Sequence, residues 1–206
     1  VCIGPDGAIY VADWFDAKVG GHGTQDEAQT GAIYRIAPQG AELSIPHFDL
    51  STSEGQIEAL KNPSPNVREL GRARLVVSGE KVIPAMKILL QDPNHFIRGR
   101  AIWVLAKLGP KGLRIVEEQL TDPNPQIRIC AFRALRHEEH RMLEHAHKLV
   151  LDPSPLVRRE VALAMRYLPF ETSRDILIEI ADRYDGKDRY YLCLLYTSPS
   201  PRDLRL

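Results

Sequence analysis

The stretch from residue 137 to residue 147 collects side chains of the types that bind transition metals: His137, Glu138, Glu139, His140, Glu144, His145 and His147. On a helix, His140, Glu144 and His147 would share one face through their i, i+4 and i+7 spacing, and a zinc ion could use that face. The pattern is not His-Glu-x-x-His, and other charged residues lie within it. We therefore expect a solvated, charged helix surface here and predict no metal.

A second set of charged residues recurs at a fixed spacing. Parallel guanidinium groups could line a groove that recognises carboxylates or a protein partner. Because aspartates recur together with the arginines, we instead predict a structural ladder of hydrogen bonds between neighbouring repeats, which would fix their stacking angle. The ladder consists of Arg68, Arg98, Arg128 and Arg158 with Asp92, Asp122 and Asp152.

The arginines belong to a longer repeated pattern. A proline occurs every 30 residues from position 63 to position 153, and apolar residues follow each one at steps of four. Steps of four place side chains on one stripe of an α-helix, and Asp-Pro or Asn-Pro suits a helix start. A second apolar stretch follows in each period, with Gly79 and Gly109 at the expected turns between helices. A fixed period of two helices predicts a solenoid of stacked units.

The repeated pattern resembles the short HEAT-like repeat named after the phycobilisome lyases. The shared features are Asp-Pro-x-x-x-Ile/Val-Arg, followed by Ala and then Leu at steps of four. The resemblance implies a mainly α fold, a HEAT-like α-solenoid of about four helix-pair repeats over residues 62–184. It implies little about function, because one fold supports many functions.

The first 48 residues have a different pattern. A Pro-Asp-Gly turn precedes a run of β-branched and aromatic residues that ends at Trp14, and residues 31–36 repeat this strand pattern. Two strands are not stable alone, so we predict that residues 1–48 are the last blade of a partial β-propeller. Residues 49–61 are expected to form a linker and a capping helix, with Ser51 and Glu54 as its capping box.

The junction between these parts resembles a bacterial family, typical of planctomycetes and verrucomicrobia. In that family a quinoprotein-dehydrogenase-like propeller precedes HEAT-like repeats and a cytochrome c segment. The similar strings are GPDGAIYVADWFDAKVGGHGTQD and GAIYRIAP within residues 4–38, and DLSTSEGQIEALKNPSPNVR at 49–68. The resemblance implies a membrane-bound or secreted, extracytoplasmic dehydrogenase with quinone, calcium and haem c in the parent protein. The chain has no Cys-x-x-Cys-His, so we expect no cofactor in this fragment.

The loop between the two predicted strands holds the residues that such chemistry would need. A quinone-dependent oxidoreductase requires a base for the substrate hydroxyl and a calcium ion that polarises the quinone. His22 is a candidate base, and Asp13 and Asp26 are candidate calcium ligands. Similar loops also serve as turn and packing elements in propeller blades. We expect that role here and assign no catalytic residue and no metal.

The C-terminal residues 193–206 differ from everything before them. The string CLLYTSPSPRD resembles the one-frame translation of a transposon-based sequencing adapter. We therefore expect a natural linker at residues 185–192 and an artefact from residue 193 onward, in a chain that is a fragment of a longer protein. A disordered tail rich in proline and serine is the alternative.

Composition narrows the possible partners. The 27 basic residues balance the 27 acidic ones, which argues against binding nucleic acid or an anionic membrane through bulk charge. No segment approaches the length of about 20 apolar residues that a membrane span needs. The three cysteines suggest no disulfide framework, and Cys130 is expected to be a small packing residue.

The sequence as a whole predicts an interaction or scaffold arm. We expect its concave helix row to bind a protein partner or a neighbouring domain of the same chain. Within the parent protein, this arm would belong to a haem-linked dehydrogenase, and the fragment itself is expected to be inactive. Two alternatives stay open, namely a stand-alone HEAT-repeat scaffold and a bilin-lyase-like HEAT protein.

Overall fold

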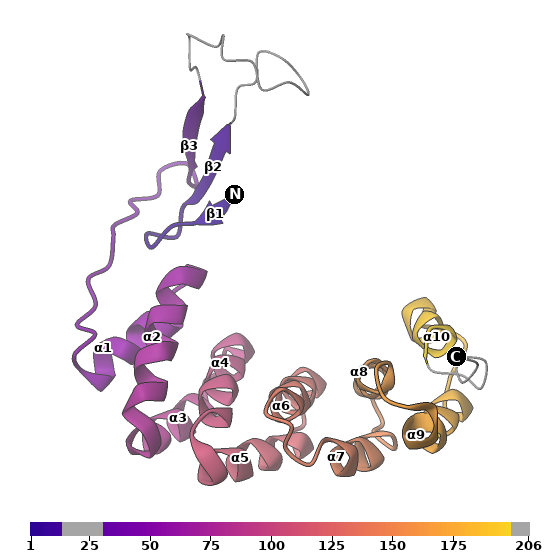
Figure 1. The fold of residues 1–206 in the computed structure, drawn as a ribbon. Helices are drawn as coiled ribbons and strands as arrows, with labels where there is room; N and C mark the ends of the chain where they lie inside the picture. Colours follow the sequence, from indigo (N-terminus) through magenta and orange to yellow (C-terminus); the bar gives the residue numbers. More distant parts are fainter. Residues whose placement is uncertain (14–30, 199–206) are drawn as a thin grey trace, which may run out of the picture. The chain divides into compact units, whose positions relative to one another are not determined.

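The chain divides into two compact units, Val1–Ser78 and Gly79–Leu206. The computed structural model describes residues 1–13 and 31–198. Helices dominate both the element order and Figure 1. The elements of unit 1 are β1 (Cys2–Ile3), β2 (Ile9–Asp13), β3 (Ala32–Ile36), α1 (Ser53–Lys61) and α2 (Pro65–Ser78). Those of unit 2 are η1 (Gly79–Val82), α3 (Ile83–Leu89), α4 (His95–Ala106), α5 (Gly109–Glu118), η2 (Gln119–Thr121), α6 (Pro125–His137), α7 (Met142–Leu149), α8 (Pro155–Met165), α9 (Phe170–Asp182) and α10 (Arg189–Tyr196).

Unit 1 begins with a small antiparallel sheet in the order β1-β2-β3. The carboxylate of Asp6, in the β1–β2 turn, accepts hydrogen bonds from the guanidinium of Arg35 at 2.7 Å and the hydroxyl of Tyr10 at 3.2 Å. The Arg35 guanidinium holds the pKa of this carboxyl below its ordinary value. These bonds tie the turn to β2 and β3. The described part of the N-terminal segment is therefore a three-stranded sheet. Whether it belongs to a propeller blade stays a prediction.

The helix α1 begins at a different cap from the expected one. Thr52 is the N-cap, and its hydroxyl accepts a hydrogen bond from the amide of Gly55 at 3.1 Å. Ser51, the predicted cap, instead donates its hydroxyl and its amide to the carboxylate of Asp49. The capping-box prediction was therefore wrong by one residue, because Asp49 offers Ser51 a nearer acceptor.

Two side chains connect the helices of unit 1 to its strands. The Ser64 hydroxyl donates to the carbonyl oxygen of Ile3 at 2.9 Å, and the Asn62 amide donates to the carbonyl oxygen of Pro5 at 3.2 Å. Both bonds join groups about 60 residues apart in the chain. The first helix pair therefore belongs with the sheet, and the unit boundary after Ser78 lies within the predicted repeats.

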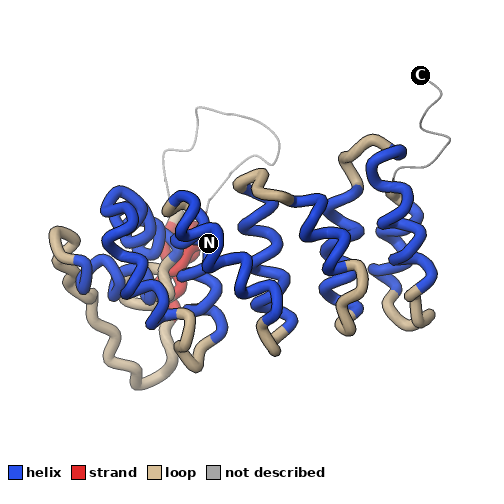
Figure 2. Tube along the Cα trace, turned by 90° about the horizontal axis from the view of Figure 1, so that it is seen from below, coloured by secondary structure: helices blue, strands red, loops and turns tan. Residues whose placement is uncertain are grey.

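Unit 2 is a stack of helices in two rows. In Figure 1, α4, α6, α8 and α10 lie on the inner side of its bend, and α3, α5, α7 and α9 lie on the outer side. Figure 2 shows the successive helices of this unit side by side. The positions eight and twelve residues after each proline are fully buried here, which confirms the predicted helical stripe. These positions are Ala101, Leu105, Ala131, Leu135, Val161 and Met165.

The helices of the inner row start two residues later than the Asp-Pro motif suggested. The N-caps of α4 and α6 are Asn94 and Asn124, whose side chains each accept a backbone amide at 2.9 Å. The preceding Asp122 accepts the amide of Asn124 at 2.8 Å and so shapes the entry loop. Gly79 and Gly109 have φ angles of 67° and 71°, which favour glycine and confirm the predicted turns.

The last helix covers the end of the apolar core. Tyr191 on α10 is 1% exposed, and its hydroxyl donates to the carbonyl oxygen of Ile180 at 2.8 Å.

Among the described residues, no helix has the length and apolar character needed to cross a membrane.

Candidate partner-binding groove

The arginine–aspartate ladder connects successive helix pairs in unit 2. Arg128 on α6 forms a two-pronged ion pair with Asp152, at 2.7 and 2.8 Å, and both side chains are at least nine-tenths buried. Arg98 on α4 pairs with Asp122 through Nη2, while its buried Nε has no hydrogen-bond partner among the described residues. Each pair joins an inner-row helix to the entry loop of the next one. The two guanidinium groups are therefore engaged within the chain rather than presented to an outside carboxylate.

The remaining members of the ladder bind backbone groups. Arg158 donates to the carbonyl oxygen of Asp152 at 2.6 Å and to that of Arg183 at 3.3 Å. Arg68, in unit 1, donates to the carbonyl oxygen of Pro63 at 2.9 Å. Asp92 accepts the amide of Asn94 at 2.8 Å. These residues shape the loops at the helix starts.

The candidate residues of the N-terminal loop do not form a described site. Asp13 is exposed at the end of β2. The predicted base His22 and the predicted ligand Asp26 lie outside the described residues. The calcium and quinone chemistry of this loop therefore stays a prediction.

The histidine-rich stretch is arranged differently from its helical spacing. Glu144 accepts hydrogen bonds from Lys148 and Arg141, which lower the pKa of its carboxyl to about 2. His147 is exposed on α7. His140 instead places Nε2 3.1 Å from Oε1 of Glu117, a residue of α5 that the local pattern did not indicate. No spacing within one helix reveals that neighbour, because it lies 23 residues earlier in the chain.

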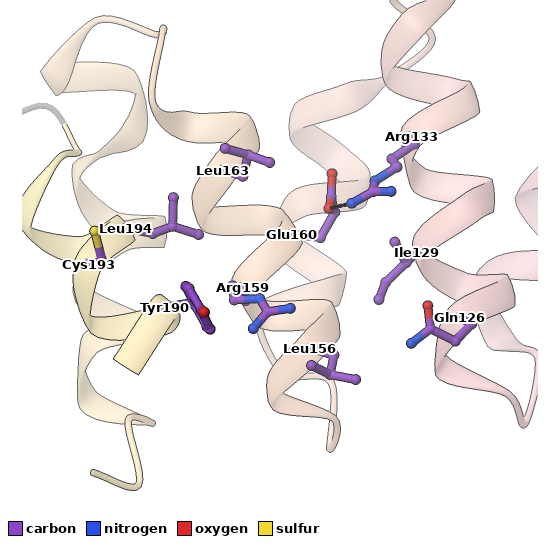
Figure 3. A pocket seen from close by; sticks show the side chains of 10 residues that line it. All are labelled: Gln126, Ile129, Arg133, Leu156, Arg159, Glu160, Leu163, Tyr190, Cys193 and Leu194. Carbon is purple, nitrogen blue, oxygen red and sulfur yellow. Dashed lines mark hydrogen bonds and ion pairs between the residues drawn. The ribbon is translucent and has the colours of Figure 1, made fainter. Parts of the chain in front are cut away.

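A groove lies on the inner row, between α6, α8 and α10 (Figure 3). Its cavity has a volume of about 540 Å³. The side chains that line it mix apolar, aromatic and charged types. They are Gln126, Ile129 and Arg133 from α6, Leu156, Arg159, Glu160 and Leu163 from α8, and Tyr190, Cys193 and Leu194 from α10.

Charged groups are fixed on the walls of the groove. Arg133 donates to the Glu160 carboxylate at 2.6 Å, the bond drawn in Figure 3, and this bond raises the pKa of the arginine. The Glu160 side chain is 5% exposed, and its other oxygen, Oε1, has no hydrogen-bond donor among the described residues. Arg136 approaches that oxygen to 3.5 Å. The Arg133 side chain remains half exposed, so its guanidinium can bind a second acceptor.

The α10 wall includes residues whose natural origin stays a prediction. Arg159 on α8 donates to Asp188 at 2.8 Å, and Tyr190 is largely exposed beside them. Cys193 and Leu194 belong to the segment that resembles an adapter sequence. The groove is therefore best defined by α6 and α8, which lie wholly within the repeats.

The groove has the composition of a binding surface. The Cys130 thiol on α6 does not line it, and burial raises the pKa of this thiol to about 11. Exposed aromatic and arginine side chains beside a small apolar surface are typical of the centres of protein interfaces. Phe96 on α4 adds an aromatic ring to the same row, with 65% of its surface exposed.

Comparison with known proteins supports the fold. No protein-family model matches the chain, and no curated protein matches it. A solved structure does match, that of the complex of CpcE and CpcF of phycocyanin lyase from Nostoc sp. PCC7120, with a TM-score of 0.51 and 17% identity. The match covers 72% of this chain and 98% of that chain. It shows a HEAT-like helical solenoid, as the repeats predicted.

Proposed function

We propose that unit 2 is a protein-binding module and that a partner segment docks between α6 and α8. The observation that carries this proposal is the combination of Ile129, Leu156 and Leu163 with the half-exposed guanidinium of Arg133. An apolar side chain of the partner would enter the groove and bury its surface, which is the main favourable term in association.

The charges of the groove favour an acidic partner segment. Arg133 and Arg159 line the groove and Arg136 lies beside it, whereas the two nearby carboxylates, Glu160 and Asp188, are already paired with Arg133 and Arg159. Arginine binds carboxylates through two parallel hydrogen bonds, so an Asp or Glu near the apolar anchor would fix the register of the segment. The partner we propose is therefore a protein segment with one large apolar side chain and a neighbouring acidic residue.

The proposal can be tested with peptides displayed on phage and selected against the full chain. We expect enriched peptides to pair an apolar residue with Asp or Glu. The variant Leu163→Asp should weaken their binding at least tenfold, about 1.4 kcal/mol, because it places a charge in the apolar groove. The control Ile88→Asp changes a 73% exposed side chain of α3 in the outer row and should leave binding unchanged.

Two results would refute the proposal that the groove is the binding site. Peptides that bind both variants as tightly as the unchanged chain would place the interaction elsewhere. Equal loss in Leu163→Asp and Ile88→Asp would indicate a general effect of added charge. Circular dichroism of each variant establishes that the helices have formed.

A bilin-lyase-like role is the second candidate. It is favoured by the fold match, since the aligned region spans 98% of a chain from a phycocyanin lyase complex. That complex joins two proteins, CpcE and CpcF, which also agrees with a module that works through a partner. Incubation of the chain with a bilin and a phycocyanin subunit tests this role. A subunit mass that increases by one bilin after denaturation would support it, and an unchanged mass would count against it.

The dehydrogenase arm is a narrower form of the same interaction proposal. Its quinone, calcium, haem c and extracytoplasmic location rest on the resemblance of the N-terminal junction and stay predictions. Neither the groove nor the fold match favours a dehydrogenase over another kind of parent protein. Sequencing of the parent locus tests it through a propeller upstream and a Cys-x-x-Cys-His motif downstream.

A further inference from the structure

Three potential metal ligands from separate segments of unit 2 converge on one point. Glu117 comes from α5, His140 from the turn after α6, and His145 from α7. The Nε2 atoms of His140 and His145 lie 3.1 and 3.2 Å from the same carboxylate oxygen, Oε1 of Glu117. All three ligand atoms lie within 4.8 Å of one another.

His145 is the unusual member of this group. The residue is 2% exposed, yet neither of its ring nitrogens has a hydrogen-bond partner among the described residues. Its Nε2 is close to Glu117, but the direction of approach does not make a hydrogen bond. Buried polar atoms in folded proteins nearly always have partners, because leaving them unpaired costs free energy. An unpaired, buried imidazole beside a carboxylate therefore indicates a missing ligand.

We propose that Glu117, His140 and His145 bind a zinc ion through Oε1 and the two Nε2 atoms. With zinc–ligand bonds of about 2.0–2.1 Å, two ligand atoms of a tetrahedral site lie about 3.3–3.4 Å apart. The distances of 3.1 and 3.2 Å from Oε1 to the two nitrogens are close to that value. Two imidazoles favour zinc over calcium or magnesium, which prefer oxygen ligands. Three protein ligands leave a fourth position for water or for a group from a partner.

Arg141 competes for the same oxygen and can be displaced. Its guanidinium donates to Oε1 of Glu117 at 3.0 Å and, through two other nitrogens, to Glu144 at 2.6 and 2.7 Å. The side chain is half exposed, so it can release Glu117 and keep its stronger, two-pronged pair with Glu144. Zinc would then take the place of the Arg141 guanidinium as the positive charge next to Oε1 of Glu117.

The proposed ion would join consecutive helix pairs. Glu117 belongs to the pair before α6, whereas His140 and His145 belong to the turn and helix after it. The turn itself is tightly shaped, since Glu139 and Arg141 on either side of His140 have φ angles of 54° and 48°. This inference goes beyond the partner-binding function and does not depend on it.

The test uses the full chain, free of any histidine tag and treated with a chelator. Titration with zinc chloride in a calorimeter should give one ion per chain. Cobalt(II) in place of zinc should give the intense visible absorption bands of tetrahedral coordination. The variants Glu117→Gln and His140→Ala should each weaken zinc binding at least about tenfold. Circular dichroism without metal shows whether each variant is folded.

The controls separate this site from the helical face that the spacing suggested. His147→Ala and His137→Ala remove exposed histidines of the same stretch and should leave the affinity unchanged. Absence of saturable zinc binding would overturn the proposal. Full binding by Glu117→Gln, or loss of binding in His147→Ala, would overturn it as well, because either result assigns the ion to other ligands.

Discussion

The buried pair of Arg128 and Asp152 provides a direct test of how the ladder stabilises unit 2. In Arg128→Met the apolar stem remains while the guanidinium is lost, so Asp152 keeps its charge in a site where its side chain is 5% exposed. Removing one partner of a buried ion pair costs about 3–5 kcal/mol. Asp152 still accepts the amide of Ser154 at 2.8 Å, which places our expectation near the lower end, at about 3 kcal/mol.

Urea unfolding measures this cost. With a urea m-value of about 2 kcal/mol/M, a loss of about 3 kcal/mol lowers the unfolding midpoint by about 1.5 M. The matched control is Arg183→Met, which breaks a 2.7 Å pair with Glu179 whose two side chains are 43% and 42% exposed. An exposed pair contributes about 0–1 kcal/mol, so this midpoint should hardly move.

The double variant Arg128→Met/Asp152→Asn identifies the cause of the loss. Asparagine keeps an acceptor for Ser154 but has no charge, so part of the lost stability should return. The reasoning fails if Arg128→Met costs less than about 1 kcal/mol at an unchanged m-value, since the pair would then behave like a surface pair.

Three further predictions concern single sites. Gly112→Ala would drive a Cβ into the carbonyl oxygen of Leu105 and should cost about 1–3 kcal/mol in urea unfolding, whereas Gly99→Ala meets only Cys130 Sγ at 3.5 Å and should not destabilise the helix. At pH 8 the Cys130 thiol, with its pKa of about 11, is about one-thousandth thiolate. Iodoacetamide should therefore modify Cys130 far more slowly than the exposed Cys2, and equal rates before urea is added would contradict its burial. The pKa of Asp6 is lower in the folded state than in the unfolded state. Its contribution to the stability of unit 1 should therefore be complete above the unfolded pKa of about 3.9 and be lost as the pH falls through the folded pKa. The ring signals of Tyr10, whose hydroxyl bonds to Asp6, should report this step when NMR spectra are recorded as a function of pH. Asp6→Asn should remove the step, and an unchanged step would assign it to another carboxyl.

The fold of unit 2 follows from the sequence because its local and global signals agree. The recurring apolar positions are buried, and the turn glycines have the positive φ angles that their places required. The helix starts were less predictable, because Asn94 and Asn124 compete as caps with the aspartates two residues earlier. The unit boundary after Ser78 depends on the bonds of Asn62 and Ser64 to the first strand segment, which have no local sequence pattern.

From the sequence, only the row of helices that lines the groove could be predicted, not its side-chain contacts. The period indicates which helices line one side of a solenoid, and a partner was expected on that side. The period does not indicate that Arg133 meets Glu160 across two repeats, or that one oxygen of that carboxylate has no hydrogen-bond donor among the described residues. Those features depend on side-chain packing between helices, and equivalent positions in other repeats hold different residues.

Several of the polar pairs in unit 2 join neighbouring repeats. The separations in sequence are 24 residues for Arg128 and Asp152, 27 for Arg133 and Glu160, 29 for Arg159 and Asp188, and 23 for His140 and Glu117. Helical spacings of three and four residues cannot detect such pairs. His140 lies in the turn before α7, so it does not share one helix with Glu144 and His147. In a chain with a 30-residue period, the informative search is for charged or metal-binding partners about one repeat apart. Glu117 answers that search for the histidine-rich stretch, since it lies within one repeat length of both His140 and His145.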